Sequence, residues 1–231
     1  MRKLFLSLAV ASFCSFMSGQ NSINLKGAKN TATPTYIVPV KLSLQNNSPK
    51  PSNNFIETEL NTLIHQGTIL QSDSAFILNS EHLSSTSGIH HYYFNQAING
   101  LEVFGTQSSI HLGVNGAVIK ANIKFVKDIL QMATASSASL TAEQAVTKVA
   151  QQMGYSISNL QELERNSFED QEVLFNKAGI SGENIPAKLM YYYKENSGVY
   201  LVWEISVQEN HTSNWFNFRV DATTGTIIDK D

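Results

Sequence analysis

Apolar residues recur at helical spacing near the start of the folded part of the chain. From Ile56 to Ile64 they return every three or four positions, which places them on one face of a helix. Gly67 follows and can adopt the left-handed conformation that ends many helices. This pattern predicts a first helix from about Ser52 to Gln66.

A second helix is predicted in the carboxy-terminal half of the chain. Thr141 and Gln144 have the spacing of a capping box, in which the Thr hydroxyl accepts from a backbone amide and the Gln side chain reaches back. An apolar stripe runs from Ala145 to Met153, and Gly154 can end the helix.

Alternating apolar and polar positions predict three antiparallel strands between these helices. The strands are Ile89 to Ile98, Leu101 to Leu112 and Ala117 to Val126. Asn99-Gly100 separates the first two strands, and this dipeptide favours the positive φ that a tight hairpin turn needs. Asn115-Gly116 has the same function between the second and third strands. The sequence therefore predicts a meander.

A second group of strands follows the second helix, and its turns contain Gly. We expect one small subdomain, a helix packed on an antiparallel sheet, in each half of the chain, joined near residues 133–139. The predicted fold class is α+β. The carboxy-terminal strands and turns are Lys188 to Tyr193, Asn196-Ser-Gly198, Val199 to Gln208, Asn214 to Ala222, Thr223-Thr-Gly225 and Thr226 to Ile228.

The amino terminus carries the pattern of a secretory signal. Arg2 and Lys3 precede an apolar stretch that is too short to span a bilayer, and Gly19 is small enough to end the cleavage site. We expect residues 1–19 to be removed and residues 20–51 to form a polar leader, in which residues 36–40 could dock as an extended segment. The only cysteine, Cys14, lies in the signal, so the secreted chain has no disulfide.

Charge and residue types exclude several functions. The net charge is −3 and shows no basic block, so nucleic acid is not an expected partner, and no later stretch is apolar enough to anchor the chain in a membrane. A zinc protease places two histidines one helical turn apart with a Glu between them, and no His-Glu dipeptide occurs here. His90 and His91 are adjacent on a predicted strand and point to opposite faces. The acid pair Glu169-Asp170 lies in a polar stretch and is interpreted as loop charge.

No serine nucleophile elbow and no phosphate-binding loop is present, so we expect no catalytic, cofactor-binding or metal-binding residue in this chain. The aromatic residues of the carboxy-terminal strands are more informative. Alternation puts about half of them in a core, either Tyr192, Trp203 and Phe218 or their alternates, and the other half on the opposite face. We expect that opposite face to bind a partner, because exposed aromatic residues often mark interfaces.

The segment from Ser87 to Val103 resembles the fungalysin/thermolysin propeptide (FTP) motif, in which a His-x-Tyr-x-x-Gln strand leads into Asn-Gly-Ile-x-Val. Gln96, Asn99-Gly100 and Val103 match, and either His90 or His91 can take the place of the motif's His. Phe125-Val126 is similar to the end of the motif.

Residues from Leu140 onward resemble a PepSY domain of the fungalysin type. The similarity is carried by Leu140 to Ala145, Ile185 to Leu189, Leu201 to Glu204 and Trp215 to Gly225. The two resemblances divide the chain into an FTP-like domain (52–132), a linker (133–139) and a PepSY-like domain (140–231).

The resemblance implies the pro-region of a secreted fungalysin-like zinc metalloprotease, which inhibits its protease domain and assists its folding. Zinc and the His-Glu-x-x-His motif are then expected only in the protease domain, which is the expected partner. The chain ends at Asp231 without that domain. From sequence, a fragment, a truncated precursor and a freestanding secreted binding module or inhibitor acting in trans all remain open.

Overall fold

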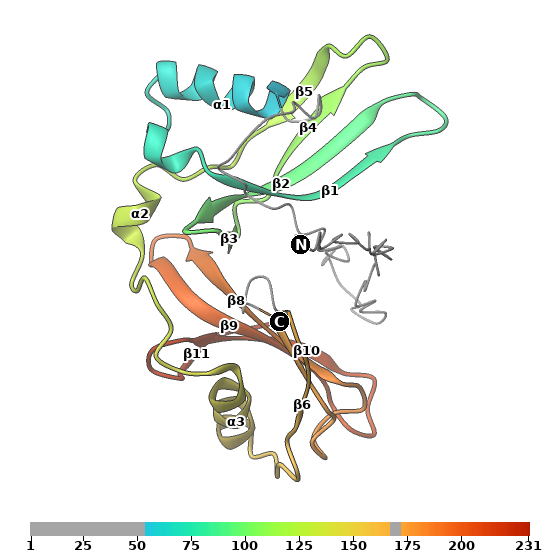
Figure 1. Ribbon diagram of the computed structural model, residues 1–231, viewed down its shortest axis with the longest axis vertical. Coiled ribbons are helices and arrows are strands. Elements are labelled where there is room, and N and C mark those ends of the chain that lie inside the picture. Colours follow the sequence, from blue (N-terminus) through green and yellow to red (C-terminus); the bar gives the residue numbers. More distant parts are fainter. Residues whose placement is uncertain (1–53, 167–171) are drawn as a thin grey trace, which may run out of the picture.

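The computed structural model describes residues 54–166 and 172–231, and Figure 1 shows their arrangement. The predicted signal, the leader with its possible extended segment, and the Glu169-Asp170 pair lie outside these residues. The first half contains α1 (Asn54–His65), η1 (Gln71–Asp73), β1 (Phe76–Leu83), β2 (His90–Ile98), β3 (Leu101–Phe104), β4 (Ser108–Leu112), β5 (Val118–Asn122) and α2 (Ile129–Met132). The second half contains α3 (Ala142–Met153), β6 (Glu162–Arg165), β7 (Glu172–Phe175), β8 (Ile185–Lys194), β9 (Gly198–Gln208), β10 (Trp215–Asp221) and β11 (Ile227–Lys230).

The strands of both halves belong to one sheet with the order β11-β10-β9-β8-β3-β2-β4-β5, while β1 pairs with β2 and β7 pairs with β8 off this path. Among the strands of residues 54–166 and 172–231, the pairing of β3 with β8 is parallel and joins the halves, while the other strand pairs are antiparallel. Helices α1 and α3 lie at opposite ends of the molecule with the strands between them (Figure 1). The fold is mixed α+β, as predicted.

The amino-terminal half has its own apolar core beneath α1. Ile56 and Leu60 on α1 pack against Tyr92 and Phe94 on β2 and Ile110 on β4, and all five side chains are buried. The predicted first helix is therefore present, with its apolar face on the sheet.

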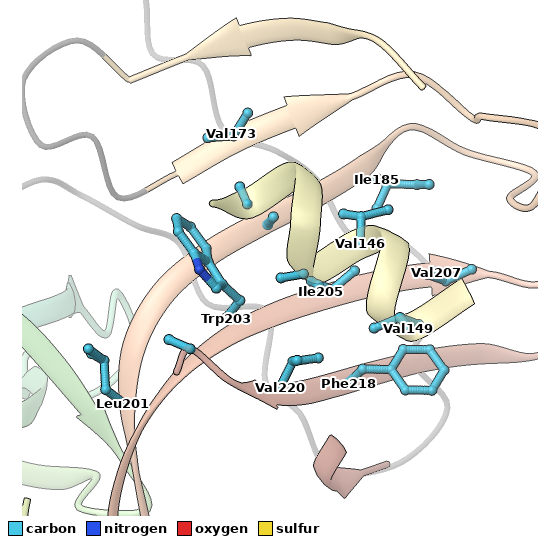
Figure 2. Packing of buried hydrophobic residues seen from close by; sticks show 14 of the residues in the cluster. Val146, Val149, Val173, Ile185, Leu201, Trp203, Ile205, Val207, Phe218 and Val220 are labelled. Carbon is cyan, nitrogen blue, oxygen red and sulfur yellow. The ribbon is translucent and has the colours of Figure 1, made fainter. Parts of the chain in front are cut away.

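The carboxy-terminal core is larger and lies between α3 and strands β7 to β10 (Figure 2). Thr141 and Gln144 form the predicted capping box, and Gly154 ends the helix with a φ of +72°. Val146 and Val149 then face the sheet, where Trp203 and Phe218 are buried. The sequence prediction for this helix is confirmed from cap to cap.

The Asn99-Gly100 hairpin is present, but its second strand is shorter than expected. Asn99 and Gly100 have φ values of +51° and +83°, as a tight turn of this kind requires, and Ile98 pairs with Leu101. The predicted single strand from Leu101 to Leu112 is wrong, because the chain leaves β2 at Gly105, whose φ is +96°. This break frees β3 to pair with β8, while β4 returns to β2.

Three strands were not expected from sequence: β1, β6 and β7. The four carboxy-terminal strands match their predictions to within a few residues, and the turn before β11 is as expected. There the Asp221 carboxylate accepts hydrogen bonds from the backbone amides of Thr223 and Thr224, and Gly225 has a φ of +78°.

Candidate interaction surface

The sheet face that points away from α3 carries a row of alternating charges. Lys188 on β8, Glu204 on β9, Arg219 on β10 and Asp229 on β11 lie opposite one another in register. The guanidinium of Arg219 lies 3.1 Å from the Glu204 carboxylate and also pairs with Asp229. Each charge therefore has a neighbour of the opposite sign on the adjacent strand, which favours the register.

Glu102 extends this row into the amino-terminal half. Its carboxylate lies 2.7 Å from the Nζ atom of Lys188 and accepts hydrogen bonds from the side-chain amides of Asn79 and Asn95. The Glu102 side chain is only 6% exposed, so its charge depends on these partners. Residues from β1, β2, β3 and β8 thus meet at one carboxylate where the two halves join.

An aromatic pair lies beside the charged row. The rings of Phe104 on β3 and Tyr192 on β8 are 6.0 Å apart, and the Arg219 guanidinium lies 4.0 Å from the Phe104 ring centre. Phe104 is 37% exposed even though it is a large apolar residue. Aromatic residues and Arg are enriched in the cores of protein interfaces. We name Glu102, Phe104, Lys188, Tyr192, Glu204 and Arg219 the junction surface.

Burial sets the electrostatics of this surface. It raises the pKa of Glu204, and the nearby charges of Arg219 and Lys188 oppose that rise. Burial also raises the pKa of Tyr192, and the carboxylate of Asp229 adds to the effect. The surface therefore holds a carboxylate that takes up a proton more readily than an exposed Glu.

The structure decides which aromatic residues face the core. Trp203 and Phe218 are buried as predicted, but among the tyrosines it is Tyr191 that lies in the core, where its hydroxyl donates to the carbonyl of Ala135. Tyr192 points to the opposite face, which is the alternate arrangement that the sequence left open.

The motif residue Gln96 has a structural role. Its buried side-chain amide donates to the carbonyls of Asp73 and Val126 and accepts from the backbone amide of Val126. It thereby ties β2 to the segments that precede β1 and follow β5.

The two adjacent histidines point in opposite directions, as expected for a strand. Nδ1 of His90 lies 2.9 Å from the hydroxyl of Tyr92, whereas His91 contacts His111 on the other face. In residues 54–166 and 172–231, no group of three or more His, Cys, Asp or Glu side chains is arranged to hold a metal ion.

The first half of the sheet matches a known family model. Residues 75–125, which span β1 to β5, match the model of the Fungalysin/Thermolysin Propeptide Motif. These residues carry an FTP motif. The match is to the propeptide motif of such metalloproteinases and not to their catalytic domain.

Similar proteins include extracellular metalloproteinases of fungi. The chain is 26% identical over 159 residues to "Extracellular metalloproteinase mep" of Aspergillus flavus, an alignment that covers 66% of this chain and 24% of that protein. The protein of the same name in Aspergillus fumigatus is 26% identical over 163 residues, which cover 68% of this chain and 25% of the relative. The chain thus spans about a quarter of the length of these relatives.

A solved structure, the YpeB C-terminal domain of Bacillus megaterium, is 14% identical to this chain and superposes with a TM-score of 0.34. The alignment covers 81% of this chain and 66% of the YpeB chain. A score this low supports no conclusion.

None of the helices in the described part of the chain is long and apolar enough to cross a membrane.

Sequence reasoning missed most of the junction surface. Glu102 and Lys188 are 86 positions apart in sequence, and no local sequence pattern predicts their contact. The one available signal was Arg219, a charge in the middle of a strand rich in aromatic residues. Such a charge requires partners on the neighbouring strands when it is buried.

Proposed function

We propose that this chain is the pro-region of a secreted fungalysin/thermolysin-type zinc metalloprotease, and that it inhibits the protease domain and assists its folding. The observation that carries the proposal is the FTP match across residues 75–125. The extracellular metalloproteinases that resemble the chain share only about a quarter of their length with it, which agrees with a role for one part of a larger precursor.

We further propose the domain division that the sequence suggested: a signal (1–19), a leader (20–51), an FTP-like domain (52–132), a linker (133–139) and a PepSY-like domain (140–231). Two separate apolar cores support a two-subdomain organisation, although one path of strands runs through both. Zinc belongs to the protease domain in this proposal, and the pro-region needs no cofactor.

The junction surface is the proposed contact for the protease domain. It combines residues from both halves, includes the exposed Phe104 beside the partly exposed Tyr192, and lies on the sheet face opposite α3. Tethering within a precursor would supply a high effective concentration, so that cutting the link would favour release of the pro-region by dilution.

The test is a titration of a cognate fungalysin-like protease with the purified chain, together with the refolding yield of the denatured catalytic domain with and without it. We expect inhibition and a higher yield. Tyr192→Glu should weaken the inhibition while the variant unfolds at nearly the same urea concentration as the wild type. Leu163→Glu is the control, because it places the same charge at an exposed apolar residue on β6, outside the junction surface.

The second candidate is a freestanding secreted binding module that acts in trans. It is favoured if the chain changes neither protease activity nor refolding yield, a result that would remove the pro-region proposal. Equal weakening by Tyr192→Glu and Leu163→Glu would remove only the junction surface as the contact.

A further inference from the structure

Three histidines lie side by side across three strands of the amino-terminal half. His82 on β1 is paired with His91 on β2, which is paired in turn with His111 on β4. The rings of His82 and His91 are stacked with their centres 4.7 Å apart, and the Nδ1 atoms of His91 and His111 are 2.8 Å apart. We name His82, His91 and His111 the histidine row.

The histidine row lies on the sheet face opposite α1, where solvent protons can reach it. Tyr92 and Phe94 of β2 point into the core under α1, so His91 and Tyr93, which alternate with them, point away from it. His82 is exposed, and His91 and His111 are partly exposed. The imidazoles are thus packed against one another without being sealed from water.

Protonation works against this packing. In the contact between His91 and His111 one ring nitrogen must accept, so the contact tolerates one added proton but not two. Lys120 on β5 is paired with His111 and adds a positive charge beside the row. Tyr93 is a further titratable neighbour on this face, with its ring centre 6.1 Å from that of His111. Like charges on adjacent strands are destabilising.

The surroundings of His111 all lower its pKa. Burial lowers the pKa of His111, and the positive charges of His91, Lys120 and His82 lower it further. No carboxylate is among the groups that act on this pKa in the described residues. The pKa of His111 in the folded chain therefore lies below its unfolded value of 6.5. Such a group contributes its full stability above pH 6.5, and this contribution is lost as the pH falls through the folded pKa.

We propose that the histidine row is an acid-sensitive element, which lowers the stability of the amino-terminal half as the pH falls through the range in which imidazoles titrate. This part concerns the chain alone. Only its consequence rests on the proposed function: acidification would loosen the hold of the pro-region on the protease domain.

The test is urea unfolding of the purified chain between about pH 8 and about pH 5.5, a window that brackets histidine titration. The wild type should unfold at a lower urea concentration at the acidic end, and His91→Gln/His111→Gln should lose most of this shift. The matched control is His65→Gln/His211→Gln, which removes two exposed histidines outside the row and should retain the shift. A wild-type shift that the row variant retains in full overturns the proposal.

A second measurement needs no variant that could fail to fold. Titration of the imidazole signals by NMR should give His111 a pKa below the ordinary imidazole value of about 6.5 in the wild-type chain, and a pKa at or above that value would overturn the proposal. Zinc added at the same concentration as the chain should leave the urea midpoint of unfolding unchanged. If zinc raises the midpoint of the wild type but not that of His91→Gln/His111→Gln, the histidine row is a metal site and the proposal is overturned. A chain that shows the acid effect but does not inhibit a protease would retain this inference and lose the proposed function.

Discussion

Removing the side-chain amide of Gln96 should be among the most damaging single changes in the amino-terminal half. Gln96 is 0% exposed, and its side chain makes three hydrogen bonds, two as donor to the carbonyls of Asp73 and Val126 and one as acceptor from the Val126 amide. Gln96→Ala leaves all three backbone groups without these partners. At about 1 kcal/mol for each hydrogen bond, the free energy of unfolding should fall by about 3 kcal/mol. That is a large fraction of the roughly 5–15 kcal/mol typical of a native protein.

The assay is equilibrium urea unfolding of Gln96→Ala followed by circular dichroism. Gln107→Ala is the matched control, because Gln107 is an exposed residue between β3 and β4 and its replacement should change the unfolding free energy by no more than about 0.5 kcal/mol. If the unfolding free energy falls by a similar amount in both variants, water or other groups replace the Gln96 contacts. The argument that Gln96 stabilises the amino-terminal half by tying β2 to the neighbouring segments is then refuted.

Two further predictions concern the carboxy-terminal half. Gly225→Val should cost on the order of 1–3 kcal/mol, because its φ is +78° and a new Cβ would lie 2.8 Å from Cγ of Lys148. Gly67→Val is the comparison, since Gly67 has a φ of +71° but nothing within 4 Å, and an equal loss in both variants would show that the contact with Lys148 does not matter. The raised pKa of Glu204 stabilises the folded wild type at low pH, and this stabilisation is lost as the pH rises and the carboxylate ionises. Glu204→Gln does not ionise, so its unfolding free energy should rise relative to that of the wild type as the pH increases from about 4 to about 8. Parallel pH profiles of unfolding for the two proteins would contradict it.

Local chemistry explains which elements were predictable. The Asn99-Gly100 turn and the Thr141 cap depend only on residues within a few positions, and both appear where the sequence predicts them. The turn that begins at Asp221 is fixed in the same way, by a carboxylate that bonds the next amides. In each case the deciding hydrogen bonds close over two to four residues, so a pattern can reveal them.

The missed elements depend on contacts that are distant in sequence. Strand β1 has an irregular register between Leu78 and Ser80, which breaks its alternation and hides it from a period-two search. The break at Gly105 lies where the chain passes close to β8, because a Cβ at that position would lie 3.0 Å from the carbonyl oxygen of Tyr193. Neither signal can be read from neighbouring residues.

The pairing of β3 with β8 makes the junction surface a property of the whole chain. Strand β3 is only four residues long, yet it pairs with β2 on one side and with β8 on the other. Glu102 reaches Lys188 from this strand, and Phe104 covers Arg219 from it. A separate carboxy-terminal half would therefore lack the carboxylate that pairs with Lys188 and the exposed ring beside Tyr192. A partner that recognises this surface responds to the docking of the two halves, and a change that separates the halves should affect binding before it unfolds either core.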